Sequence, residues 1–150
     1  MDGIKPYTPP ANAPRGIRNN NPLNIREGEG GGDQWRGEAA AEIDAGFEEF
    51  DAPQYAYRAA VKVLRSYRKR GLITVEQIIA EWAPSRENNV EAYIASVIDQ
   101  TGWQPGHVVA EAEGDYIALF RAMAVHENGR AWAEHESLSY QVIQQGVALA

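Results

Sequence analysis

The sequence predicts a single domain of the α+β class, mostly helical with one small β-hairpin lobe near its N-terminal end. Hydrophobic residues recur at helical spacing in several segments after residue 52, whereas the stretch 15–51 is rich in glycine and asparagine and has only short apolar pieces. A chain of 150 residues with 44% hydrophobic content can bury one core and is too short for two independent domains.

The N-terminal residues 1–14 are predicted to form an extended arm outside the folded domain, which comprises residues 15–150. The arm contains four prolines and shows no helical or strand periodicity, so we expect it to dock on a partner or to stay mobile. It also lacks the unbroken apolar stretch of a secretion signal, and no later segment is apolar enough to span a bilayer. We therefore expect a chain that is made in the cytoplasm without a signal peptide.

The segment 15–51 is predicted to form the irregular hairpin lobe. Short apolar pieces surround Ile25, Trp35 and Ile43, and glycines cluster between residues 28 and 32. The cluster lacks the Gly-Lys-Ser/Thr ending that a phosphate-binding loop needs, so we interpret it as a hairpin loop and expect no nucleotide cofactor.

Five helices are expected in the rest of the chain, each with apolar residues at three- and four-residue intervals. Pro53 suits a first helical turn, Thr74 with Gln77 resembles a capping box, and Asn88 can cap the third helix. The expected helices run from Pro53 to Gly71, from Thr74 to before Pro84, from Asn88 to before Gly102, from about Asp115 to Gly129, and from near Glu136 to Leu149.

Composition argues against several functional classes. The formal net charge of −7 opposes binding to nucleic acid, and we interpret the basic face of the first long helix as a solvated surface. Without cysteine the chain can form neither disulfides nor thiolate metal sites. His126 precedes a glutamate, but Arg130 occupies the position where a zinc-binding His-Glu-x-x-His motif needs its second histidine, so no metal is expected.

Glu127 is the candidate catalytic residue. It follows Met123 by four residues and Phe120 by seven, which places its carboxylate on the apolar stripe of a helix. Burial and the negative end of the helix dipole before Gly129 both raise a carboxyl pKa, and a carboxyl that is protonated near neutral pH can serve as the general acid of glycosidic cleavage. The alternative is a structural glutamate that ends the helix or pairs with Arg130 at the surface.

Four asparagines lie in the turn-prone segment 19–24. Their amides can bind the hydroxyl and acetamido groups of a sugar chain, or they can simply form a turn.

Several motifs together resemble a family of phage virion-associated lysozyme-like proteins. They are Arg15-Gly-Ile-Arg-Asn-Asn-Asn-Pro-Leu-Asn-Ile-Arg26, Phe47-x-x-Phe50, Trp82-Ala-Pro with Glu87-Asn88, Tyr93, and His126-Glu-Asn-Gly129. That family is similar to lytic transglycosylases and flagellar-type glucosaminidases, in which a helix ending in Glu-Ser-Gly precedes an Asn-Asn turn. Here the order is permuted, because the candidate catalytic helix follows the turn.

The resemblance implies a lysozyme-like domain in which Glu127 is the catalytic glutamate. It implies that Asn20, Asn21 and Asn24 shape the floor of a cleft, and that Tyr93, Glu87 and Asn88 border the sugar or orient the glutamate. Such turns usually have glycine where this chain has Leu23, so the local turn is expected to differ.

The resemblance implies cleavage of the glycan strands of bacterial peptidoglycan. A hydrolase needs a second carboxylate, and the sequence does not select among Glu38, Glu42, Asp44, Glu48 and Glu49. A lytic transglycosylase needs only one glutamate and is favoured by the resemblance. Such an enzyme would be carried by a phage particle or released through a membrane lesion, act in the periplasm or cell wall, and contact other virion proteins through its arm.

Two other functional classes remain open. One is a virion structural protein that keeps the fold without activity, because a fold does not guarantee a function. The other is a cell-wall binding module that stacks sugars on aromatic rings; the four tryptophans available for this are Trp35, Trp82, Trp103 and Trp132.

Overall fold

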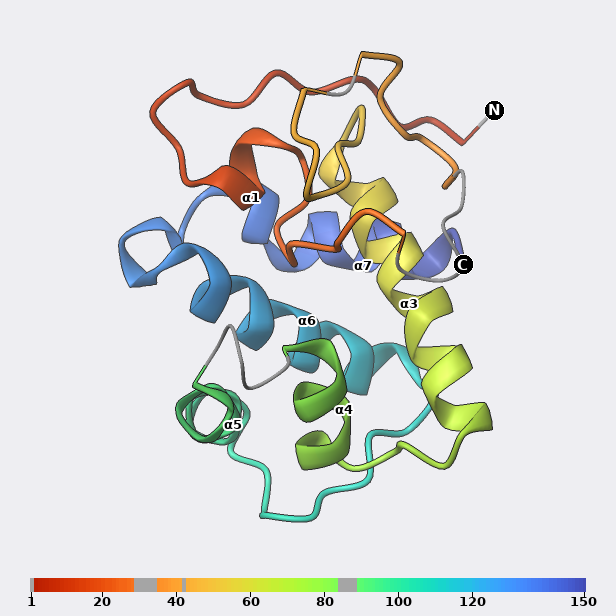
Figure 1. Ribbon diagram of the computed structural model, residues 1–150, viewed down its shortest axis with the longest axis vertical. Helices are drawn as coiled ribbons and strands as arrows, with labels where there is room; N and C mark the ends of the chain where they lie inside the picture. Colours follow the sequence, from red (N-terminus) through yellow and green to blue (C-terminus); the bar gives the residue numbers. More distant parts are fainter. Residues whose placement is uncertain (1, 29–34, 42, 84–88) are drawn as a thin grey trace.

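The computed structural model describes residues 2–28, 35–41, 43–83 and 89–150. Figure 1 shows α6 crossing the middle of the molecule, with α4 and α5 below it and α1 and α7 above it. The helices, in chain order, are α1 (Arg15–Arg18), α3 (Pro53–Lys69), α4 (Val75–Trp82), α5 (Val90–Thr101), α6 (Glu113–Asn128), the 3₁₀ turns η1 (Arg130–Trp132) and η2 (Glu136–Leu138), and α7 (Tyr140–Ala148).

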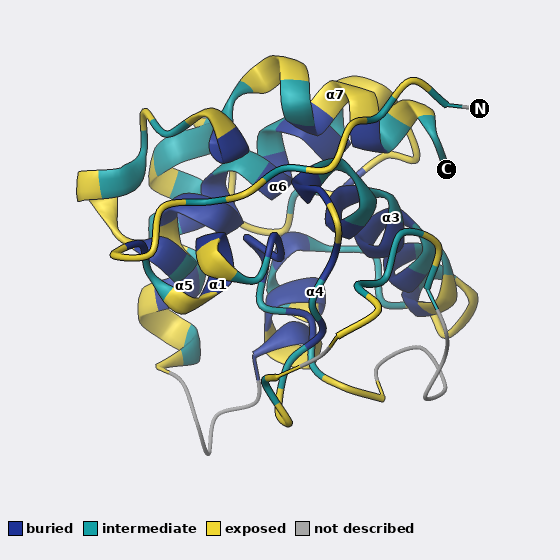
Figure 2. Cartoon of the chain, turned by 90° about the horizontal axis from the view of Figure 1, so that it is seen from above, coloured by how far each residue is buried: buried dark blue, intermediate teal, exposed yellow. Residues whose placement is uncertain are grey.

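Helix α6 is the centre of the core. Its middle turns are apolar on nearly every side, with Leu119, Phe120 and Met123 fully buried, and it contacts α1, α5 and α7. Buried residues gather in the interior on α3, α4 and α6, while the exposed ones lie on the outer faces (Figure 2). Neither α6 nor any other helix in the described part of the chain combines the length and apolar character needed to cross a bilayer.

The starts of α3 and α4 follow the sequence signals. Pro53 occupies the first turn of α3, where its missing N–H is not needed. The Thr74 hydroxyl accepts from the Gln77 N–H, and the Gln77 side chain accepts from the Thr74 N–H, which confirms the capping box. Local side-chain chemistry therefore suffices to place both helix starts.

Three helix boundaries differ from the predicted ones. Asn89, not Asn88, caps α5 by accepting from the Ala92 N–H. Helix α6 begins at Glu113, two residues before Asp115, but ends before Gly129 as predicted. The last helix is interrupted, because residues 136–138 form the turn η2 and α7 begins only after them.

The prediction of an α+β fold with a β-hairpin lobe was wrong. Within residues 15–28, 35–41 and 43–51, pairing is limited to isolated antiparallel bridges, Arg26 with Phe47 and Glu38 with Phe50, and no sheet forms in the described part of the chain. The segment begins with the short helix α1 and continues as turns. The fold is therefore helical, with an irregular lobe packed against the helices.

Side-chain amides take the place of a β-ladder in this lobe. The Asn21 amide donates to the carbonyls of Ile25 at 2.9 Å and Glu48 at 3.0 Å, and its oxygen accepts from the Ile25 N–H. The Asn20 amide similarly donates to the carbonyls of Tyr7 and Phe50. Because these side chains satisfy backbone groups that a neighbouring strand would otherwise pair, the lobe is held together without regular strands.

The N-terminal arm lies along the same body. The Tyr7 N–H donates to the Asp51 carbonyl at 2.8 Å, and Asp2 accepts from both Arg36 at 2.7 Å and the Tyr55 hydroxyl at 2.9 Å. The arm is extended, as its prolines predict, and it is fixed to the lobe and to α3 by these contacts.

Candidate functional site

Glu127 lies in the last turn of α6 with a partly buried side chain. Its Oε1 accepts a hydrogen bond from Asn24 Nδ2 at 2.9 Å, and its Oε2 accepts one from the Tyr93 hydroxyl at 2.8 Å. The donors come from the asparagine turn and from α5, which are 103 and 34 residues away in sequence. Tertiary folding therefore fixes both oxygens of one carboxyl with neutral donors.

Tyr93 reaches Glu127 because it lies on the face of α5 that packs against α6. Its side chain is fully buried, and its ring stacks on His126 with the centroids 4.0 Å apart. The stacked and buried ring fixes the position of the side chain, and its hydroxyl donates to the carboxyl of Glu127.

The asparagine turn presents Asn24 to the carboxyl through an unusual backbone conformation. Asn24 and Asn20 both have a φ of +52°, a left-handed conformation that asparagine tolerates better than most residues. Leu23 is not among the positive-φ residues, so the expected departure from the glycine-containing turn places no strain on the leucine. The Leu23 side chain is instead fully buried in the core.

Asn128 holds the asparagine turn against the end of α6. Its Nδ2 donates to the Pro22 carbonyl and to the Ala124 carbonyl, each at 2.8 Å. A Cβ at Gly16 would lie 2.7 Å from Asn128 Oδ1 and 3.0 Å from the Asn21 carbonyl oxygen, so a larger residue would displace the Asn128 side chain. Sequence reasoning missed Asn128, although its position next to Glu127 and four residues after buried Ala124 could have indicated it.

Replacing Asn128 with alanine is expected to lower the free energy of unfolding by about 2 kcal/mol, because two buried carbonyls lose a donor. The measurement is urea unfolding of the variant beside wild type. Asn12→Ala, at an exposed position of the arm, serves as the matched control and should stay within about 0.5 kcal/mol of wild type. Equal stability of both variants would contradict the role of Asn128.

The Glu127 carboxyl has its pKa raised above the usual value for glutamate. Burial is the main cause, because it disfavours the charged form. Hydrogen bonds from Asn24 and Tyr93 and the positive charge of Arg26 lower the pKa, but they do not offset the burial. A carboxyl with a raised pKa stays partly protonated at higher pH and can deliver a proton to a bound molecule.

The structure separates the sequence-predicted site residues into three groups. Asn24 and Tyr93 contact Glu127 directly. Asn20 and Asn21 use their amides on the backbone of the arm and the lobe, and their contact with a sugar stays a prediction. The predicted positions 87 and 88 (Glu87 and Asn88) lie outside the described residues.

The acidic residues considered as a second catalytic carboxylate serve different roles in the lobe. Asp44 pairs with Arg15 at 3.0 Å, and Glu49 accepts from the N–H groups of Ile43 and Asp44. Glu48 is fully buried, and Glu38 accepts from the Trp35 N–H. Glu42 lies outside the described residues. None of these contacts identifies a partner for Glu127 in catalysis.

Three carboxylates of the lobe lie close to one another. Oxygen atoms of Glu27, Glu38 and Glu48 lie within 4.8 Å of each other, a spacing that suits a hard cation such as Ca²⁺. Glu27 is exposed, Glu38 is half-buried and Glu48 is buried. Acidic clusters of this kind also occur without a metal, so the prediction that the chain binds none stays a prediction.

Comparison with known proteins shows that this chain is similar to a phage protein. No model of a known protein family matches it. The chain is 47% identical over 118 residues to Protein P5 of Pseudoalteromonas phage PM2, a similarity that spans 78% of this chain and 72% of that protein. Identity of this level over most of both chains shows common descent, and the chain therefore belongs to the family of Protein P5 of Pseudoalteromonas phage PM2.

Proposed function

We propose that this chain cleaves the glycan strands of bacterial peptidoglycan as a lytic transglycosylase, with Glu127 as the general acid and base. The observation that carries the proposal is the carboxyl of Glu127, which is partly buried, has a raised pKa and is held by the neutral donors Asn24 and Tyr93. A surface glutamate that only paired with Arg130 would need neither donor. In the structure Arg130 instead approaches Asp99, with 3.9 Å between their charged atoms.

The proposed reaction uses one carboxyl twice. In its protonated form Glu127 donates a proton to the glycosidic oxygen as the bond to the anomeric carbon breaks. The carboxylate that results takes the proton from the C6 hydroxyl of the same sugar, whose oxygen then bonds to the anomeric carbon. The products are an anhydro sugar end and a free hydroxyl on the departing sugar, and the glutamate ends protonated as it began.

The two donors have a defined part in this cycle. Asn24 and Tyr93 stabilise the carboxylate form, which the second half of the reaction requires, while burial favours the protonated form, which the first half requires. The opposed effects keep the proton affinity of Glu127 between that of an exposed carboxyl and that of a fully desolvated one. This balance suits a group that must both give and take a proton near neutral pH.

The setting of the proposed reaction is a phage infection. The relative from phage PM2 supports a phage origin. We propose that the protein reaches the cell wall as part of a virion, with the N-terminal arm available for contact with other virion proteins.

The proposed function is tested by digesting purified peptidoglycan with the protein and analysing the soluble fragments by mass spectrometry. Fragments with anhydromuramic ends are the expected result. Fragments with reducing ends would indicate a hydrolase with a second carboxylate. If no fragments form and the protein still binds the polymer, a binding module replaces the enzyme; neither cleavage nor binding would favour a structural protein of the virion.

Tyr93→Phe is expected to move the alkaline limb of the activity profile to higher pH. The hydroxyl lowers the pKa of Glu127, so its removal raises that pKa and keeps the acid protonated further into the alkaline range. The maximal rate should fall by about tenfold, because one charge-stabilising hydrogen bond is lost. The measurement is kcat/KM against pH. Tyr140→Phe, at an exposed site on α7, is the control, and an unchanged limb in Tyr93→Phe would contradict the contact.

A further inference from the structure

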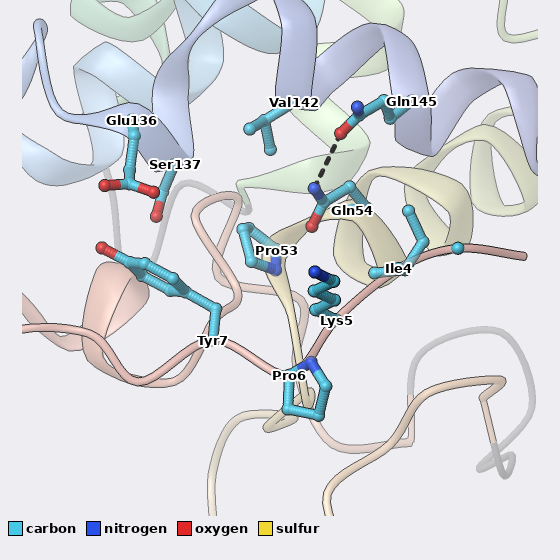
Figure 3. Close-up of a pocket in the computed structure, with 11 residues that line it drawn as sticks. Ile4, Lys5, Pro6, Tyr7, Pro53, Gln54, Glu136, Ser137, Val142 and Gln145 are labelled. Atoms are coloured by element: carbon cyan, nitrogen blue, oxygen red, sulfur yellow. Dashed lines mark hydrogen bonds between the residues drawn. The ribbon is translucent and has the colours of Figure 1, made fainter.

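A pocket lies between the N-terminal arm and the helices, lined by residues that the proposed reaction does not use. Its volume is about 280 Å³, and its walls come from residues 3–7, the start of α3, η2 and α7. Figure 3 shows the arm on one side of this space and the helices on the other. A cavity of this size lies just below the usual range of about 300–1,000 Å³ for ligand pockets, so it can enclose part of a short peptide.

The pocket carries one charge of each sign. The Lys5 side chain comes from the arm and that of Glu136 from η2, and in Figure 3 they lie on opposite sides of Pro53. Lys5 forms no ion pair with any carboxylate in the described part of the chain. A ligand with a carboxylate at one end and an amine at the other would therefore find a partner for each.

A buried hydroxyl supports a ligand independently of these charges. Ser137 is fully buried, and its Oγ has no hydrogen-bond partner among the described residues. In Figure 3 the hydroxyl points into the space between Glu136 and Tyr7. A buried polar atom left without a partner is destabilising, so an acceptor atom from a ligand at this position would be favourable.

The far wall offers groups that match a peptide unit. Gln54 Nε2 donates to Gln145 Oε1 at 2.8 Å, a contact that joins α3 to α7. Within the described part of the chain, the Gln54 oxygen and the Gln145 nitrogen form no further hydrogen bond. One acceptor and one donor thus remain, which complement the N–H and the carbonyl of a peptide group, while Pro53 and Val142 supply an apolar surface beside them.

We propose that this pocket binds a short peptide with a free carboxylate and a free amine. The identity of that peptide rests on the proposed function, because the polymer to be cleaved is peptidoglycan. We infer that the peptide is the stem peptide of peptidoglycan, which carries carboxylates and, in its diaminopimelate residue, an amine. A neutral sugar would leave Lys5 without an anionic partner, and a phosphate, which carries no amine, would be repelled by Glu136. The pocket would hold the stem peptide while Glu127 acts on the glycan.

The test is isothermal titration of the full chain with the free tripeptide L-alanyl-γ-D-glutamyl-meso-diaminopimelate. Saturable binding is expected for wild type. Lys5→Met should raise Kd by about tenfold, because one charge-assisted hydrogen bond is lost, and Glu136→Gln should weaken binding similarly. Lys62→Met, which removes the same charge further along α3 at a residue that does not line the pocket, is the matched control and should bind as wild type does.

Two results would overturn the proposal. One is the absence of tripeptide binding by the folded wild-type protein. The other is binding that Lys5→Met and Glu136→Gln leave unchanged, since the peptide would then lie elsewhere. Amidation of the tripeptide's carboxylates and acetylation of its amines remove the charges of the ligand. Both modifications should weaken binding, as the two variants do.

A second assay separates this inference from the proposed function. Glycan strands stripped of their peptides by an amidase are offered to the wild-type protein. Cleavage of these strands without tripeptide binding would refute the proposed peptide site and support the proposed enzymatic activity. Tripeptide binding without cleavage of either the stripped strands or intact peptidoglycan would support the proposed peptide site and refute the proposed enzymatic activity.

Discussion

Glu127→Gln is expected to lower the rate of glycan cleavage by roughly 10²- to 10⁴-fold, because glutamine keeps the volume of the side chain but cannot exchange a proton. The rate is measured as release of soluble fragments from purified peptidoglycan at the pH optimum of wild type. Glu134→Gln, whose side chain is 96% exposed shortly after α6, makes the same chemical change outside the site and should keep full activity. Wild-type activity in Glu127→Gln would refute the assignment.

The stability of the same variant distinguishes loss of chemistry from loss of fold. Burial raises the pKa of Glu127 in the folded chain above its value in the unfolded chain. The resulting stabilisation of the folded chain is complete below the pKa that Glu127 has in the unfolded chain, and it is lost as the pH rises through the pKa that Glu127 has in the folded chain. Glutamine does not titrate. Glu127→Gln should therefore match wild type in acid and be the more stable of the two at neutral pH. A less stable variant would mean that the site is distorted.

Gly146→Ala is expected to be the most destabilising single substitution considered, although alanine favours helices by about 1 kcal/mol over glycine. A Cβ at this position on α7 would overlap the backbone carbonyl oxygen of Gln54 and lie 2.6 Å from Tyr57 Cβ. Because a helix backbone cannot yield as a flexible side chain can, α3 and α7 would have to separate. We expect a net loss of about 3 kcal/mol.

Thermal unfolding measures this effect, and a fall in Tm of roughly 10 °C is expected. Gly114→Ala is the matched control, since Gly114 also lies in a helix, has no atom within 4 Å of its added Cβ and should gain stability. If both variants gained stability, the close approach of α3 and α7 would be incorrect. Gln54 and Gln145, on the same two helices, form the far wall of the proposed peptide pocket, so the result also bears on that site.

The sequence predicted the helices well because their signals are local. Pro53, the capping pair Thr74 and Gln77, and Gly129 each act within one turn of their own helix. The hairpin lobe was predicted wrongly because turn residues and short apolar pieces are shared by strands and irregular loops. What distinguishes the two is where the amides of Asn20 and Asn21 donate, and their partners lie elsewhere in the chain.

The sequence by itself determined the order and approximate extent of the main helices, and it placed Glu127 on a buried stripe, because these properties depend on neighbours three or four residues apart. Only the tertiary structure decided which groups meet that carboxyl and what holds them there. Asn24, Tyr93 and Asn128 converge from three segments, and the pocket beneath the arm needs residues from both ends of the chain. Such contacts depend on how helices pack, and packing is set by the whole core and not by any single segment.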